Sequence, residues 1–146
     1  MQKFTAQELL EYALKSGKSV SLKNGSIAKI VGYISLTDEY IGYVVGISSI
    51  SLKQKAKATT WTKEGVNTEL SDYNIKVISS TNELAEYALQ NNIGMTIQTP
   101  YGRSTVNVIG KTKDSRYITV YQSNSELIAE YVSDDNYSLD KVDLVL

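Results

Sequence analysis

One short segment occurs twice in this chain, and that repetition constrains the fold more than any other feature. Residues 5–14 read TAQELLEYAL, and residues 80–89 read STNELAEYAL. Six of the ten positions are identical, and the Thr/Ser and Gln/Asn pairs are conservative. Self-similarity of this kind indicates two copies of one unit. We therefore predict one copy in residues 1–78 and a second copy in residues 79–146.

The length of the chain fits this division. A chain of 146 residues is the size of one ordinary domain or of two small ones that share a core. A unit of ~70 residues closes only a modest core by itself, so we favour two copies packed as a pseudo-symmetric pair. Hydrophobic residues make up 42% and charged residues 21% of the chain, which is typical of a folded protein rather than a disordered one.

Each copy is expected to open with an amphipathic helix, over residues 5–16 and residues 81–91. Apolar residues recur three and four positions apart in both segments, which places them on one face of a helix. Both segments also carry start and stop signals: a hydroxyl residue with Glu three positions later, and then a residue that tolerates left-handed backbone. These residues are Thr5, Glu8 and Gly17 in the first copy and Ser80, Glu83 and Asn92 in the second.

Short antiparallel strands are expected after each helix. Asn24-Gly25 between two apolar runs is a strong hairpin signal. The expected strands are residues 19–23, 27–35, 40–49, 51–62 and 73–78 in the first copy, and 95–99, 104–110, 117–122, 127–132 and 142–146 in the second. The predicted fold class is α+β, with one N-terminal helix and about five antiparallel strands in each tandem repeat.

The chain contains no Cys and no His, which narrows its chemistry. His is the side chain best suited to proton transfer near neutral pH and the commonest metal ligand, and Ser and Cys nucleophiles usually need it as a partner. We therefore expect no enzyme, no cofactor and no metal, although mechanisms that use carboxylates alone stay open. We also expect a cytoplasmic protein without a membrane partner, because no signal-peptide pattern and no apolar run of ~18 residues is present.

Charge differs between the two copies. Residues 1–78 carry ten Lys and seven acidic residues, a net charge of +3 (10 − 7). Residues 79–146 carry five basic and nine acidic residues, a net charge of −4 (5 − 9), so the sum is the −1 of the whole chain. Opposite charges would help two copies dock, or one copy would present a surface to an anion, and the sequence leaves both interpretations open.

One predicted strand carries a row of cations. Side chains at alternate positions of residues 53–61 share one face of a strand. Three ammonium groups followed by the only Trp of the chain would bind phosphates and stack a base. Alternatively, the lysines protect an edge strand from aggregation. The candidate ligand-binding residues here are Lys53, Lys55, Lys57 and Trp61.

A second candidate site surrounds the only two arginines, which both lie in the second copy near tyrosines. The Arg guanidinium offers a fixed fork to phosphate, and Tyr offers a ring to a base. Eleven Tyr against one Phe supports this interpretation, because Tyr is common on recognition surfaces. Surface Arg is also ordinary, and Tyr is a good strand residue. The candidate residues are Tyr101, Arg103, Lys111, Lys113, Arg116, Tyr117 and Tyr121.

Parts of each copy resemble the Thoeris-inhibiting sponge families, small phage proteins that defeat bacterial immune signalling. The similar parts are the opening from Phe4 to Lys18 and the close at residues 72–75; the second copy keeps the helix and Asp140. The Arg and Trp that the family carries after the Gly-Lys pair are missing from residues 21–23. The resemblance implies reversible sequestration of a cyclic nucleotide-type messenger without turnover, and it assigns no binding residue.

The leading hypothesis is a non-enzymatic cytoplasmic binding protein, a phage-encoded anti-defence sponge that sequesters a small anionic nucleotide. The alternative is a protein–protein inhibitor or virion accessory protein that meets a host defence protein through an exposed sheet face or edge. Both are compatible with a homo-oligomer, and neither involves long nucleic acid. Arg103 and Arg116 around one concavity would favour the first hypothesis, and their dispersal would favour the second.

Overall fold

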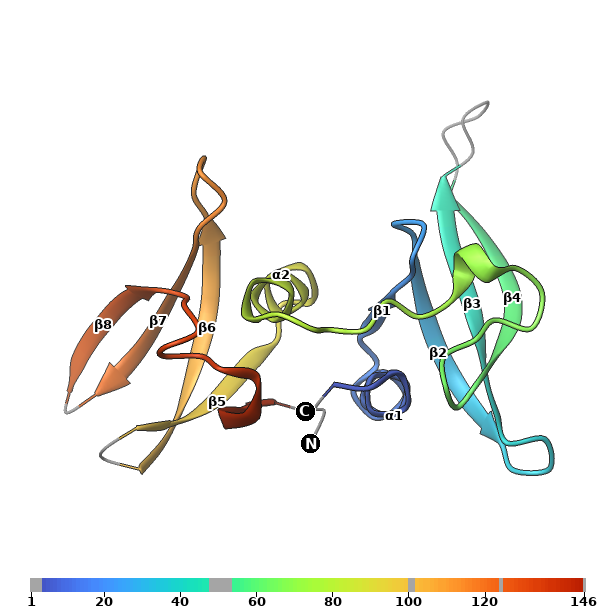
Figure 1. The fold of residues 1–146 in the computed structure, drawn as a ribbon, viewed down its shortest axis with the longest axis horizontal. Coiled ribbons are helices and arrows are strands. Elements are labelled where there is room, and N and C mark those ends of the chain that lie inside the picture. Colours follow the sequence, from blue (N-terminus) through green and yellow to red (C-terminus); the bar gives the residue numbers. More distant parts are fainter. Residues whose placement is uncertain (1–3, 48–53, 100–101, 124, 146) are drawn as a thin grey trace. The chain divides into compact units, whose positions relative to one another are not determined.

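The computed structural model describes residues 4–47, 54–99, 102–123 and 125–145 (Figure 1). The chain divides into two compact units, a first unit of Phe4–Val77 and a second unit that begins at Ile78. Each unit contains one α-helix and one antiparallel sheet, so the predicted α+β class is confirmed. No helix in the described ranges is long and apolar enough to cross a membrane.

Both predicted helices are confirmed, with α1 at Ala6–Ser16 and α2 at Thr81–Asn91. A hydroxyl cap begins each helix and a residue with left-handed backbone ends it: Thr5 and Gly17 for α1, Ser80 and Asn92 for α2. The capping-box carboxylates reach one residue further than expected. Each accepts the backbone N–H of the residue before the cap: Glu8 from Phe4 at 3.2 Å, and Glu83 from Ser79 at 3.0 Å.

The first unit contains a four-stranded antiparallel sheet in the order β1-β2-β3-β4. Its strands are β1 (Ser19–Ser21), β2 (Ile27–Ile34), β3 (Glu39–Ile47) and β4 (Gln54–Thr62). The predicted strand at residues 73–78 is wrong: Ser71–Tyr73 form a 3-10 turn, η1, and only Ile75 bridges to Leu22. A ladder cannot extend there, because the chain after Leu22 already turns and donates the Gly25 N–H back to the Leu22 carbonyl.

The second unit contains a five-stranded antiparallel sheet in the order β8-β7-β6-β5-β9, and all five predicted strands are confirmed. Its strands are β5 (Gly94–Thr99), β6 (Gly102–Lys111), β7 (Tyr117–Ser123), β8 (Glu126–Tyr131) and β9 (Val142–Leu144). A 3-10 turn, η2 (Leu139–Lys141), precedes β9. Strand β8 is therefore one edge of this sheet.

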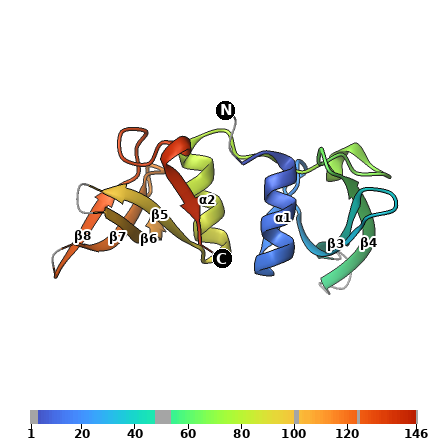
Figure 2. The same cartoon turned by 90° about the horizontal axis from the view of Figure 1, so that it is seen from below.

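In each unit the helix packs against one face of the sheet, which we call the helix face (Figure 2). Helix α1 contacts β1 and β2, and helix α2 contacts β6 and β7. The segments after β4 and β8 return to the same side: Gly65 lies against Ala6, and Tyr137 against Thr119. The opposite, outer face of each sheet therefore receives neither a helix nor a return segment of its own unit among the described residues.

Candidate functional site

The predicted row of lysines lies on β4, which is an edge strand of the first sheet. Lys53 and the side chain of Lys55 lie outside the described part of the chain. The Nζ of Lys57 is 3.1 Å from Glu69 Oε2 and 5.8 Å from the centre of the Tyr73 ring. The hydrogen bond and charge of Lys57 lower the pKa of Glu69. The one described lysine of this row is therefore already paired within its own unit.

Trp61 does not present its ring to a ligand, so this part of the prediction is corrected. Its side chain is fully buried, and its indole Nε1 donates to the Tyr73 carbonyl at 2.7 Å. The strand alternation correctly placed Lys57 and Trp61 on one face. At Trp61 this face is buried in the core, because Trp61 lies opposite the buried Tyr40 of β3. Trp61 is thus a core residue of the first unit.

Arg103 also has partners within its own unit. It lies near the start of β6, and its Nη2 is 2.6 Å from Asp143 Oδ2 and 2.9 Å from Thr96 Oγ1. Eight positions separate it from Lys111 along the same strand (111 − 103), roughly 25 Å at the usual rise of a strand. Arg103 and Arg116 therefore lie near opposite ends of the sheet, and the structure does not gather them around one concavity.

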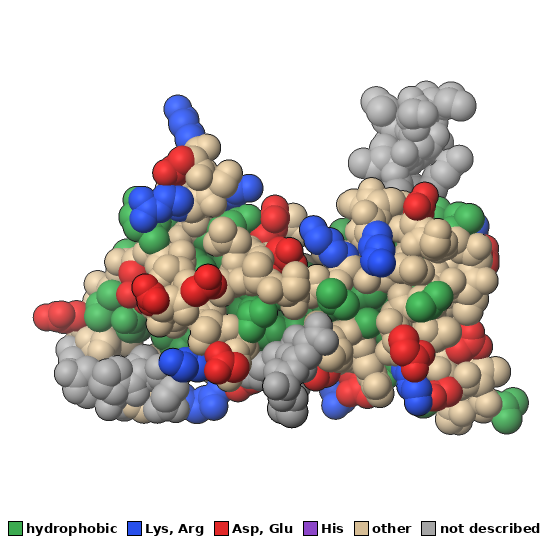
Figure 3. All heavy atoms as spheres, in the orientation of Figure 1, with side chains coloured by type: hydrophobic (Ala, Val, Ile, Leu, Met, Phe, Trp, Pro, Cys, Tyr) green, Lys and Arg blue, Asp and Glu red, His purple; other side chains and the backbone are tan. Residues whose placement is uncertain are grey.

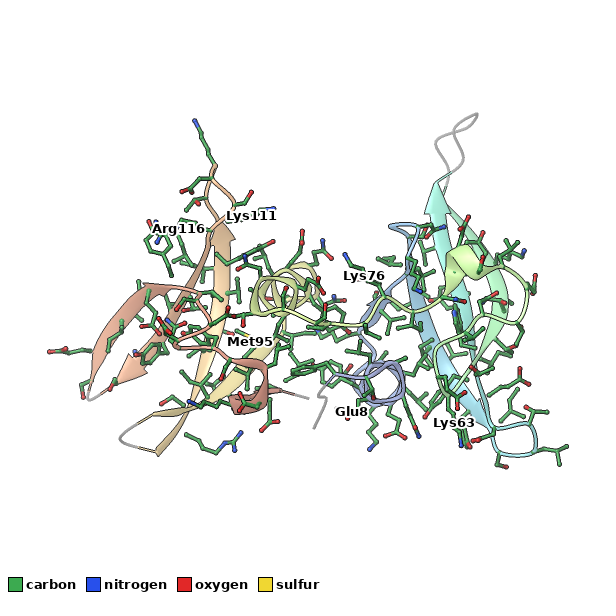
Figure 4. All side chains as sticks on the ribbon, in the orientation of Figure 1. Glu8, Lys63, Lys76, Met95, Lys111 and Arg116 are labelled. Atoms are coloured by element: carbon green, nitrogen blue, oxygen red, sulfur yellow. The ribbon has the colours of Figure 1, made fainter. Side chains whose placement is uncertain are left out.

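The remaining basic candidates gather at one end of the β6–β7 hairpin. We call Lys111, Lys113 and Arg116 the basic hairpin; Figure 4 shows Lys111 and Arg116 at its end, and Lys and Arg side chains gather there in Figure 3. The turn between them is well fixed. Thr112 N–H donates to the Arg116 carbonyl at 2.8 Å, and Arg116 N–H donates to Thr112 Oγ1 at 3.1 Å. Asp114 is held by the Thr112 hydroxyl, which lowers the pKa of its carboxyl.

Arg116 is the cation of the basic hairpin that stacks on a ring of the neighbouring strand β8. Its guanidinium carbon lies 3.6 Å from the centre of the Tyr131 ring, a close cation–π stack. Within the described ranges, Arg116 has no carboxylate at ion-pair distance, in contrast to Arg103, Lys57 and Lys63. Its charge helps to lower the pKa of Asp114 in the same turn, and a guanidinium stacked by its face can still offer its N–H edge to a carboxylate or a phosphate.

Two of the predicted tyrosines lie on the helix face and not beside Arg116. Tyr117 is buried, and burial followed by the nearby Glu86 raises the pKa of its hydroxyl. Lys111 Nζ lies 5.4 Å from the centre of the Tyr117 ring. Tyr121, half-buried, shares this face because it follows Tyr117 by an even number of strand positions. The expectation that Tyr117 offers an open ring to a ligand is therefore wrong, and Tyr101 lies outside the described residues.

The outer face of the second sheet carries an exposed apolar surface that the sequence interpretation missed. Cross-strand pairing places Ile118 opposite Tyr131 and Val120 opposite Ala129, and Leu127 completes the row. Leu127 is 70% exposed and Tyr131 is 45% exposed. Alternation of apolar residues along 127–131 was the available signal. We call these five residues, with Arg116 at one end, the outer patch.

Comparison with known proteins finds no match to this chain among family models, curated proteins or solved structures. Among the described residues, no three His, Cys, Asp or Glu side chains gather in a way that could hold a metal ion.

Proposed function

We propose that this chain is a non-enzymatic binding protein that acts in the cytoplasm and contacts an acidic protein partner through its outer patch. Arg and Tyr are, with Trp, the residues most enriched at the energetic centres of protein interfaces. Here they lie on the same sheet face as the exposed Leu127 and the half-buried Ile118 and Val120. The outer patch combines these features on one sheet face. A protein inhibitor that acts by binding alone needs such a surface and no catalytic group.

The observation that carries the proposal is the state of Arg116. Its side chain is positioned by the Tyr131 ring and makes no ion pair among the described residues. A partner carboxylate at this point would gain a charge-assisted hydrogen bond to a group that is already oriented. The neighbouring Leu127 would bury apolar area on the same contact.

Selection from a displayed library of random linear peptides tests this function. Peptides that bind should be enriched in Asp or Glu next to apolar residues. Their affinity should fall at least about tenfold in Arg116→Ala, which is the loss of a charge-assisted bond, and stay within about twofold in Arg103→Ala. Arg103 is the matched control because Asp143 already occupies its guanidinium. Peptides without acidic residues, or equal losses in both variants, would contradict the proposal.

A second candidate function is sequestration of a small anionic nucleotide, as in a phage-encoded anti-defence sponge. The specific observation in its favour is the basic hairpin, which holds Lys111, Lys113 and Arg116 within six consecutive residues. Such a cluster attracts phosphates. This candidate ranks second because Arg103 is far from the hairpin and because Tyr117 is buried.

Isothermal titration against a panel of cyclic nucleotides and cyclic ADP-ribose isomers separates the two candidates. Sequestration requires heat with at least one compound at about 100 μM protein, the weak end of useful small-molecule affinity, and loss of that heat in Lys113→Ala with Arg116→Ala. The absence of heat with every compound would remove this candidate and leave the protein-partner proposal unaffected.

The tandem duplication is also part of this proposal, because local irregularities occur at corresponding places in both units. The register shifts between Ile30 and Gly32 in β2 and between Val108 and Gly110 in β6. In the first unit Tyr40 donates to Glu11 at 3.2 Å, and in the second Glu86 acts on Tyr117. An experimental structure tests the duplication: β1 to β4 should superpose on β5 to β8, and a failure of the two bulges to coincide would oppose it.

A further inference from the structure

Strand β8 points a row of backbone groups away from β7, at the edge of the second sheet. Val132 N–H donates to the Tyr117 carbonyl at 2.9 Å, and antiparallel pairing alternates from there along the strand. The N–H and C=O groups of Leu127, Ala129 and Tyr131 therefore point away from β7. The Tyr131 carbonyl already accepts Asn136 Nδ2 at 2.9 Å, and no other described strand lies beyond β8.

This edge carries only part of the usual protection of an edge strand: two Glu residues, and Asn136 at the Tyr131 end. Residues 126–131 contain neither Lys nor Pro, and the pairing of β8 with β7 contains no bulge. The corresponding edge of the first sheet, β4, differs. A return segment covers one end of it, with Thr62 N–H donating to the Val66 carbonyl at 2.9 Å and Thr68 N–H to the Thr60 carbonyl at 3.1 Å. An open edge of this kind is a template for another strand.

We infer that β8 pairs in antiparallel fashion with β8 of a second copy of this chain, with Ala129 of each copy on the two-fold axis. The two Ala129 backbones then exchange both of their hydrogen bonds, and each Tyr131 N–H donates to the Leu127 carbonyl of the other copy. On the outer face, Leu127 of one copy meets Tyr131 of the other, which is a favourable aliphatic–aromatic pair. The outer patches of both copies become one continuous apolar surface.

The charges of β8 select this register over its neighbours. Centred on Ala129, Glu126 lies opposite Val132 and Glu130 lies opposite Ile128 of the other copy. A shift that centres the pair on Ile128 would place Glu126 opposite Glu130, and centring on Glu130 would place that residue opposite itself. Like charges directly opposite one another destabilise a strand pair. Pairs centred on Leu127 or Tyr131 also avoid this repulsion, but they overlap fewer residues of β8 than the pair centred on Ala129, which joins residues 127–131 of both copies. The strand is therefore self-complementary over its longest charge-compatible overlap, which favours a second copy as its occupant.

Sedimentation of the full chain over a wide concentration range tests this inference. We expect a monomer–dimer equilibrium in the wild type and at least a tenfold weaker dimer in Ala129→Pro, because proline removes the outward N–H and leaves the β7 ladder intact. The matched control is Ala58→Pro, since Ala58 lies opposite Tyr43 on the edge of β4 as Ala129 lies opposite Val120 on β8. A wild type that stays monomeric, or equal weakening by both prolines, would overturn the inference.

A cysteine variant keeps the test decisive if the proline variant does not fold. The chain has no native Cys, so Ala129→Cys provides a single thiol, and antiparallel partners exchanging hydrogen bonds lie about 5.5 Å apart at Cα, within reach of a disulfide. Mild oxidation should convert most Ala129→Cys chains to a covalent dimer and leave Ala58→Cys monomeric. Dimer yields that do not differ between the two variants would refute the β8 pairing.

Discussion

The hydroxyl of Tyr137 is predicted to contribute much of the stability of the second unit. Its side chain is fully buried, and the hydroxyl lies 2.7 Å from Thr119 Oγ1 and 2.8 Å from Glu130 Oε1. It therefore joins the segment after β8 to both β7 and β8. Tyr137→Phe removes this hydroxyl and leaves the ring itself unchanged.

The magnitude follows from the two bonds. A neutral hydrogen bond contributes about 1 kcal/mol and one to a charged group about 1.5 to 3 kcal/mol. Both losses are softened in the variant. Half-buried Glu130 is rehydrated, and the Thr119 proton, which Tyr137 and the Glu130 carbonyl share in the wild type, is donated to that carbonyl alone, 3.3 Å away. We therefore expect Tyr137→Phe to lower the free energy of unfolding by about 2 to 3 kcal/mol.

Urea unfolding followed by far-UV circular dichroism measures this loss. Tyr131→Phe is the matched control, since it makes the same chemical change on a ring that is 45% exposed and leaves the stack with Arg116 in place. The control should lose less than about 0.5 kcal/mol, as surface substitutions usually do. The reasoning is refuted if the two variants unfold at the same urea concentration.

Three further predictions concern the folded state. Burial, followed by the charge of Glu11, raises the pKa of Tyr40 to about 12, whereas the unfolded side chain ionises near 10. The contribution of Tyr40 to the free energy of unfolding should therefore be fully present below pH 10, and about 2 to 3 kcal/mol of it should be lost as pH rises through 12. Urea unfolding at increasing alkaline pH should show this fall in the wild type and a smaller fall in Tyr40→Phe. If the free energy of unfolding fell equally with pH in both proteins, ionisation of Tyr40 would not be its cause. Gly65 has φ 84°, and an added Cβ would lie 2.5 Å from Ala6 Cβ, so Gly65→Ala should cost about 2 kcal/mol or more in the same assay. Asn92→Gly should raise the thermal midpoint by the equivalent of about 0.5 to 1 kcal/mol, because glycine adopts the left-handed C-cap without strain; a lowered midpoint would mean that the Asn side chain contributes there.

The parts of the fold that depend on neighbouring residues were predictable from the sequence. Thr5 and Ser80 specify helix starts through bonds that span three positions, and Asn24-Gly25 specifies a hairpin within four residues. The prediction of a strand at residues 73–78 was wrong because a strand depends on partners that are distant in the sequence. Its alternation is that of a strand, but its partners at residues 21–23 lie far away in the sequence and are too few to form a ladder.

The candidate site was harder to predict because it depends on which face of a sheet is covered. Alternation placed Lys57 and Trp61 on one face of β4, yet it could not show that this face turns into the core at Trp61. Arg103 looked available because its partner, Asp143, is 40 residues away. Predicting that Arg116 stacks on Tyr131 would have required the register of β7 against β8, which no local sequence pattern specifies.

The central claim is that Arg116 and the outer patch form the contact surface of the protein, and one calorimetric comparison tests it most directly. The affinity of a selected acidic peptide is measured for the wild type, Arg116→Ala and Arg103→Ala. The two substitutions remove the same charge from the same unit, but of the two only Arg103 has an ion pair among the described residues. We predict a loss of at least about tenfold for Arg116→Ala and a change within about twofold for Arg103→Ala. Equal losses, or a loss in Arg103→Ala alone, would contradict the account.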